Sequence, residues 1–369
     1  MKSRLLSRLE DDIRSATQTL AADRLRCERA AYLARLGEFD EATREIAAVH
    51  QRHEARPNAA ISVWLNLAHG LVSHYRELGS QAHDRVRRAH AMSVAAGLTD
   101  LQALSAAWLA HLDYLRMNAT GAAGHAAEAL RLARSDHHAA QARACLVVAQ
   151  TYDEAGRLDR ARPWYDQAHR HATAEGDDAT LSAMLWNKAS LRVAALRQAV
   201  ASGQVGAAAE AQALLSAEST ANFDAMLGVR SLRALQPILR AQTCSLLGRT
   251  DEALALYEQH LTEALDQGLR SIEGTLVADR AWCRLQARNI SGASEDARLA
   301  EGCLAREAPF GDRAPGHSRL TQVWEALGDH AAAERQRQLS LHAWQGHARD
   351  QANLLEALDK ALAAAPPVS

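Results

Sequence analysis

Amphipathic helical segments alternate with short turns along almost the whole chain. In the segment ACLVVAQTYDEAG, Cys145, Val148 and Tyr152 lie at positions i, i+3 and i+7, which places them on one face of an α-helix. Gly156 is expected to end this helix, because glycine adopts the left-handed conformation of a helix C-cap without strain. A second amphipathic segment, LDRARPWYDQAHRHA, follows directly. The pattern predicts two packed helices joined by a tight turn.

The same turn recurs at regular intervals. LGEFDEA, AGRLDRA, LGRTDEA and LGDHAAA each place a Gly five residues before an Ala. Together with weaker copies, the predicted turns fall at positions 37, 79, 118, 156, 203, 248, 288 and 328. The period of about 40 residues is in the range of stacked helical hairpins. The sequence therefore predicts eight copies of one supersecondary unit.

The best copy carries a specific signature around its turn Gly. A small residue lies seven before it, an aromatic four before, Ala five after, an aromatic nine after and Ala twelve after: Ala149, Tyr152, Ala161, Tyr165 and Ala168. This signature resembles that of the tetratricopeptide repeat family, over about residues 20 to 350. The resemblance implies an all-α fold, a right-handed superhelical α-α solenoid of about eight hairpins whose first helices line a concave groove.

The period exceeds the usual 34 residues of that family. The extra residues follow the second helix, in AAGLTD, EGDDAT and DQGLRS, where we expect a second Gly to cap the helix and Asp or Ser to start the next one. Long-period repeats of this type resemble those of bacterial signalling proteins. We expect an N-terminal capping helix over residues 1–20, the repeat solenoid over 21–348, and a C-terminal capping helix with a short tail over 349–369.

Composition and charge narrow the function classes. The hydrophobic content of 48% with only 4% aromatic residues favours helices over an all-β fold. With 42 basic and 44 acidic side chains, no global field draws the protein to nucleic acid or a membrane. Five dispersed cysteines and no long apolar N-terminal segment indicate a reducing, cytoplasmic location.

No motif for catalysis or cofactor binding is found. The sequence has no His-Glu-x-x-His, no Gly-rich phosphate loop and no nucleophile elbow, and its 17 histidines lack clustered ligands at metal spacing. The acidic pair Asp177 and Asp178 lies where capping or first-turn carboxylates belong. We therefore expect no catalytic residue, no metal and no cofactor.

Candidate groove residues follow from their offsets to the turns. Trp108 and Trp282 lie ten and six residues before their turns, on the face that looks into the groove in the resembled family. Offsets of thirteen, ten, six or three nominate Asn66, His69, Arg76, Arg143, Gln150, Asp153 and Gln242, and the similar strings WLN and LWN add Asn187. Amides can pair with a peptide backbone, and Arg can hold a carboxylate. The alternative is that these residues are simply solvated.

The leading hypothesis is a non-enzymatic cytoplasmic scaffold or adaptor that binds a protein or peptide in its concave groove, as a signalling or regulatory module. It predicts no direct contact with nucleic acid or membrane. One alternative is the sensory, peptide-responsive half of a larger bacterial regulator whose output domain lies elsewhere. Another is an all-helical α/α toroid enzyme, which would need a central cluster of carboxylates.

Overall fold

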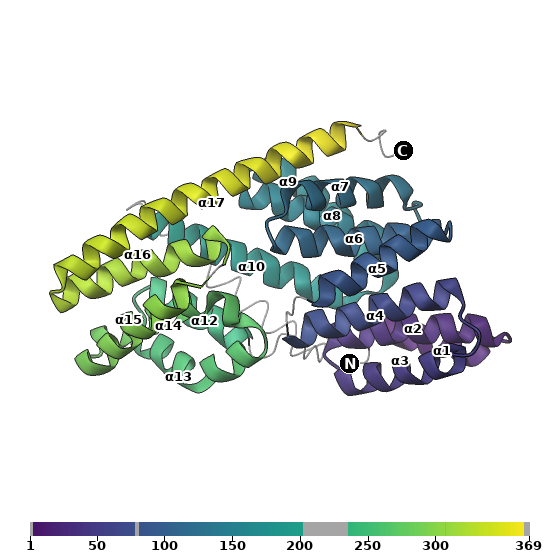
Figure 1. The fold of residues 1–369 in the computed structure, drawn as a ribbon, viewed down its shortest axis with the longest axis horizontal. Helices are drawn as coiled ribbons and strands as arrows, with labels where there is room; N and C mark the ends of the chain where they lie inside the picture. Colours follow the sequence, from purple (N-terminus) through teal and green to yellow (C-terminus); the bar gives the residue numbers. More distant parts are fainter. Residues whose placement is uncertain (1–2, 78–80, 202–234, 307, 365–369) are drawn as a thin grey trace. The chain divides into compact units, whose positions relative to one another are not determined.

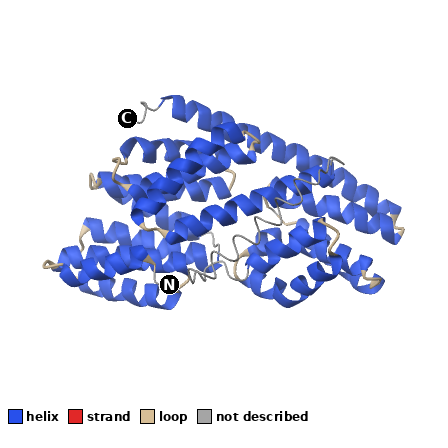
Figure 2. Cartoon of the chain, turned by 180° about the vertical axis from the view of Figure 1, so that it is seen from behind, coloured by secondary structure: helices blue, strands red, loops and turns tan. Residues whose placement is uncertain are grey.

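The computed structural model describes residues 3–77, 81–201, 235–306 and 308–364, and helices are the regular elements in all these ranges, with no strand (Figure 1, Figure 2). In chain order the helices are α1 (Arg4–Ser15), α2 (Thr19–Leu36), α3 (Phe39–His53), α4 (Ala59–Glu77), α5 (Gln81–Ala95), α6 (Thr99–Leu115), α7 (Ala119–Leu132), α8 (His138–Glu154), α9 (Leu158–Glu175), α10 (Asp178–Ala201), α12 (Leu235–Leu246), α13 (Thr250–Asp266), η1 (Leu269–Ile272), α14 (Glu273–Gln286), α15 (Ile290–Leu304), α16 (Phe310–Leu327) and α17 (His330–Ala364). The predicted all-α class is confirmed.

The helices pair into hairpins that pack on their neighbours. The pairs α2/α3, α4/α5, α6/α7 and α8/α9 follow one another, and α12/α13, α14/α15 and α16/α17 form a second series. The first helices of consecutive hairpins pack together, as α2 does on α4 and α14 on α16. This is the predicted α-α solenoid, in which each hairpin buries its apolar face against adjacent ones.

The turns lie where the repeat places them. Four predicted turn glycines, at positions 37, 156, 248 and 328, have φ between 72° and 87°. The turns expected at 118 and 288 also form, but Met117 and Arg288 take the positive φ there. Asn118 and Asn289 then cap the next helices through their side chains. The turns predicted at 79 and 203 lie outside the described residues.

The second set of glycines also behaves as expected at the helix ends. Gly97, Gly176 and Gly268 all have positive φ. The expectation of Asp or Ser at the next helix start is met by Asp177, whose side chain accepts the Thr180 amide at 2.9 Å. The other two segments differ. The residue before α6 is a leucine, whose side chain makes no cap, and η1 separates Gly268 from α14.

Small and aromatic residues alternate inside the α8/α9 hairpin. In α8/α9, Ala149, Ala161 and Ala168 are at most 1% exposed, and Tyr152 and Tyr165 are 1% and 5% exposed. The alanines let the two backbones approach, and each tyrosine fills the wider space one turn along. The best copy of the repeat therefore packs as its signature predicts.

The chain divides into two compact units. Among the described residues, the first comprises 3–184 with 351–364, and the second comprises 185–201 with 235–350. The first unit includes α1, whose Leu5 and Leu9 are buried against Tyr32, Leu36 and Ala179. The second includes a small cluster of Ala189, Val193 and Leu239.

The last helix is longer than expected. The sequence predicts a separate C-terminal helix from residue 349, whereas α17 runs unbroken over 35 residues from His330. Gly346 lies inside this helix, and the Phe310 ring packs where a Cβ on this glycine would be. Within the first unit, the end of α17 buries Leu354 and Leu358 in the cluster that contains α8 and α9. The three-part division at residues 20 and 348 stays a prediction.

Candidate binding site

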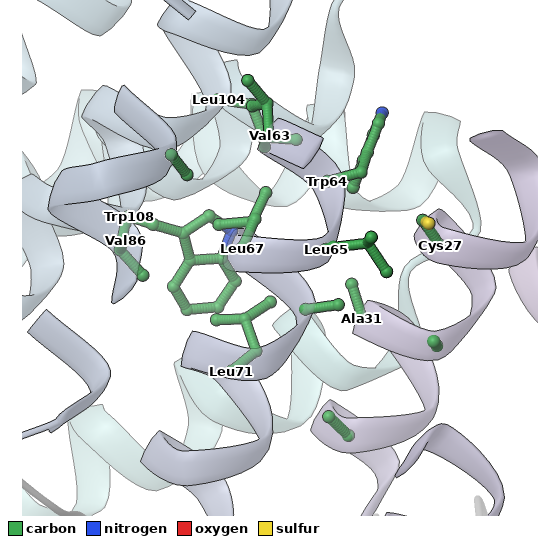
Figure 3. Close-up of a cluster of buried hydrophobic side chains, with 14 of the residues drawn as sticks. Cys27, Ala31, Val63, Trp64, Leu65, Leu67, Leu71, Val86, Leu104 and Trp108 are labelled. Atoms are coloured by element: carbon green, nitrogen blue, oxygen red, sulfur yellow. The ribbon is translucent and has the colours of Figure 1, made fainter. Parts of the chain in front are cut away.

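The first helices of four successive hairpins surround a cavity in the first unit. α2, α4, α6 and α8 supply most of its wall, and its volume is about 650 Å³. Leu67 and Leu71 of α4 and Trp108 of α6 form much of the apolar lining and belong to the buried cluster drawn in Figure 3. The junctions between hairpins, at residues 97–100, 134–138 and 175–177, complete the wall and include the first residues of α6 and α8 and the last residue of α9.

The wall is closed by a contact between residues far apart in sequence. Arg35, near the end of α2, donates from Nη2 to both carboxylate oxygens of Asp177 at 2.8 Å and to Thr180 Oγ1 at 2.6 Å. The Leu5 amide donates to the Gly176 carbonyl at 3.2 Å beside this ion pair. These bonds hold the start of α10 against α1 and α2.

Arg143 of α8 is the second buried guanidinium in the cavity wall. It is 2% exposed, and its Cζ lies 4.1 Å from the centroid of the Trp108 ring, a cation–π geometry. Its Nε and Nη2 have no hydrogen-bond partner. Burial holds the pKa of Arg143 below its usual range and Arg35 acts in the same direction, while Tyr75 and Asp177 oppose them.

The neighbouring imidazoles are neutral. Burial, assisted by Arg143, lowers the pKa of His74 to about 4, and the same two causes hold the pKa of His111 well below its usual value. The two rings meet edge to face with centroids 5.4 Å apart. The buried charges at this place are therefore two guanidiniums and the single carboxylate of Asp177.

Acidic side chains lie elsewhere in the cavity lining. Glu28, Asp100, Asp136 and Glu175 all contribute to it. Arg134 pairs with Asp100 at 3.1 Å and with Asp136 at 3.0 Å. Burial, reinforced by Glu175, raises the pKa of Glu28 to about 7. Arg8 pairs with Glu175, so most of the acidic charge in this part of the wall is balanced by neighbouring arginines.

Of the ten residues predicted for the groove, the structure brings Trp108 and Arg143 together in this cavity. The three candidates on α4 have other surroundings. Asn66 Nδ2 donates to the Ser62 carbonyl at 2.9 Å. Arg76 is exposed, lies 3.6 Å from Asp40 and stacks over the Phe39 ring. His69 is half-buried, and its burial lowers its pKa.

Two further candidates on α8 are buried but do not line the cavity. Gln150 is 4% exposed and its Oε1 has no hydrogen-bond partner. Asp153 accepts a bond from the Tyr165 hydroxyl at 3.0 Å. Asp153 therefore has a contact within its own hairpin, between its two helices.

The remaining three candidates belong to the second unit. Gln242 lines a smaller cavity of about 220 Å³ in that unit. The Trp282 ring lies under Arg319, with 5.4 Å from its centroid to Cζ. Arg319 in turn donates to the fully buried Asp279 at 3.0 Å. Asn187 is half-buried on α10.

Sequence reasoning missed Arg35, Trp64 and the ionic role of Asp177. Arg35 lies two residues before its turn glycine, outside the offsets used for the groove. Asp177 was expected as a cap, and that is confirmed, but its partner lies 142 residues away. Trp64 has a buried Nε1 without a hydrogen-bond partner in the cavity wall. No local signal links these three residues.

In the ranges that the structure describes, no group of three or more His, Cys, Asp or Glu side chains is arranged to hold a metal ion. No helix in the same ranges combines the length and apolarity needed to cross a bilayer.

Comparison with known proteins supports the fold. No protein-family model matches the chain, and no curated protein matches its sequence. Among solved structures, a Rap protein complexed with competence and sporulation factor has a TM-score of 0.56 at 11% identity, over 94% of this chain and 92% of that one. The P58(IPK) TPR domain aligns over 87% of this chain and 81% of its own at 17% identity, with a TM-score of 0.31. The likeness to the Rap protein, with the observed hairpins, supports an all-helical solenoid fold.

Proposed function

We propose that the protein is a non-enzymatic, cytoplasmic scaffold of helical repeats that binds a peptide or a short protein segment, as part of a signalling or regulatory system. The observation that carries the proposal is the cavity of about 650 Å³ lined by the first helices of four hairpins. Its volume and mixed apolar and polar lining are typical of a ligand site. The Rap protein of similar fold was solved in a complex, which supports the same use of the fold here.

The buried polar groups of the cavity favour binding over a purely structural role. Arg143 and Trp64 both carry buried donors without a partner, and such groups cost free energy in a core that never meets a ligand. An extended peptide supplies backbone carbonyls and a terminal carboxylate as acceptors. The protein would therefore act by contact with another chain.

The test is a selection from a displayed peptide library on the full-length protein, followed by calorimetric titration of the selected peptides. Ala60 is half-buried and lines the cavity, whereas Ala59 beside it in the first turn of α4 is exposed. We expect Ala60→Trp to weaken binding at least tenfold because the ring occupies cavity space, and Ala59→Trp to leave it unchanged. Peptides that bind both variants equally, or a selection without any binder, would contradict the proposal.

A further inference from the structure

We propose that the ligand carries a carboxylate that accepts hydrogen bonds from Nε and Nη2 of Arg143, with its apolar part against Trp108 and the leucines of α4. The inference rests on the proposed function and names the chemistry of the occupant. A peptide C-terminus and a free monocarboxylic acid share this group. The experiment below distinguishes the two.

The first argument is charge. Asp177 neutralises Arg35, with both of its oxygens 2.8 Å from Nη2. Arg143 lies in the same wall, 2% exposed, and no carboxylate of the described chain forms an ion pair with it. His74 and His111 beside it are neutral, since burial and Arg143 lower their pKa. A buried cation without a counter-ion is unfavourable, and an anionic ligand would supply the missing charge.

The second argument is geometry. Nε–H and one N–H of Nη2 lie on the same edge of a guanidinium and point in parallel, which is the arrangement that a carboxylate accepts with two oxygens. Both of these nitrogens of Arg143 are without a partner, although the guanidinium also has a hydrogen bond with the Tyr75 side chain. The Trp108 ring, 4.1 Å from Cζ, fixes the plane of the guanidinium. The structure thus holds a pre-oriented two-donor edge.

The third argument is the remaining lining. Leu67, Leu71 and Leu104 present apolar surface to the cavity, and Trp64 Nε1 adds a donor without a partner. Glu28 and Glu175 also line the cavity, but Glu175 is paired with Arg8, so Arg143 is the buried cation of the wall that has no ion-pair partner. A single such cation matches a ligand with one carboxylate on an apolar body better than a polyanion such as a nucleotide.

The probes are N-acetylated tripeptides ending in Leu or Phe, the same peptides as C-terminal amides, and 4-phenylbutyrate as a free acid. In titrations of the full-length protein, the amides are expected to bind roughly tenfold to hundredfold more weakly than the acids, which is the range for hydrogen bonds to charged groups. Arg143→Gln is expected to remove the difference between acid and amide. Arg143→Lys, which keeps the charge but not the two-donor edge, is expected to restore part of it.

A stability measurement keeps the test independent of folding. A buried cation without a counter-ion is unfavourable, so Arg143→Met is expected to raise the melting temperature of the ligand-free protein. The same substitution is expected to abolish binding of the acids. A merely structural Arg143 would give the opposite shift in melting temperature.

Equal affinity for acids and amides, or unchanged acid binding by Arg143→Gln, overturns the inference. If library-selected peptides bind the cavity with no preference for a free C-terminus, the carboxylate site is refuted and the proposed scaffold function remains. If 4-phenylbutyrate binds through Arg143 while no peptide binds, the carboxylate site is supported from a free acid and the peptide function fails.

Discussion

Removing the charge of Asp177 tests whether its ion pair with Arg35 closes the first unit. In Asp177→Asn the amide oxygen can still accept the Thr180 amide, so the cap of α10 is kept. Arg35 is 9% exposed and Asp177 2% exposed, and the substitution leaves the guanidinium buried without its carboxylate. Breaking a buried pair from one side costs about 3–5 kcal/mol. We expect a loss of that size in the free energy of unfolding.

The double variant Arg35→Met with Asp177→Asn separates the pair from its surroundings. With both charges removed, neither member of the pair is left buried without its partner, so we expect most of the lost stability to return, as for other buried pairs replaced by apolar groups. Asp159→Asn is the matched control, since its carboxylate lies in the first turn of α9, is 73% exposed and contributes only about 0.3–1 kcal/mol through the helix dipole.

The assay is urea unfolding followed by circular dichroism, with hydrogen exchange of the amides of residues 176–184 as a local measurement. Because the ion pair and the Leu5–Gly176 bond hold this segment, its exchange should accelerate in Asp177→Asn and recover in the double variant. A loss below about 1 kcal/mol, or single losses that simply add in the double variant, would refute the role given to the pair.

Two further predictions concern a backbone position and a pH dependence. Gly176 and Gly97 have φ of 75° and 64°, but a Cβ on Gly176 would lie 3.1 Å from Arg4 Cβ, while nothing lies within 4 Å of one on Gly97. We expect Gly97→Ala to lose about 1–2 kcal/mol in urea unfolding and Gly176→Ala to lose more; equal losses would contradict the close packing. For His74 the folded pKa of about 4 lies below the ordinary 6.5, so its contribution is present above pH 6.5 and is lost as the pH falls to 4, by up to about 3 kcal/mol. His74→Gln should therefore lose less stability than the wild type between pH 7 and pH 5 in urea titrations. Equal losses in the two proteins would contradict the lowered pKa of His74.

Turn chemistry explains why the repeat was predictable. A glycine such as Gly156 determines a helix end by its own conformational freedom, and the residues that complete the hairpin lie within twelve positions of it. Met117 and Arg288 show the limit of this argument, because the same turn forms there on residues that seldom adopt positive φ. At both places the next residue, Asn118 or Asn289, caps the following helix through its side chain.

The candidate site was predictable only in part, for a related reason. Trp108 and Arg143 follow from their offsets to their own turns, and they meet because successive first helices pack together. Asn66 has one of the same offsets, yet its side-chain amide donates to the carbonyl of Ser62, one turn earlier on its own helix. Arg35 and Asp177 meet only after the four hairpins from α2 to α9 have stacked on one another. Long-range closure of that kind is a property of the stack and not of any single repeat.

The residues that lengthen each repeat have a separate consequence. Helix faces hold the hairpins together through small residues such as Ala149 and Ala161, whereas the junctions between hairpins, at residues 97–100, 134–138 and 175–177, contribute to the cavity wall. Those junctions carry four of the five acidic residues that line the cavity. Changes of charge at Asp100 and Asp136 can therefore alter which molecule is admitted without disturbing the stack, whereas the junction at Asp177 also carries the ion pair with Arg35 and couples ligand preference to stability.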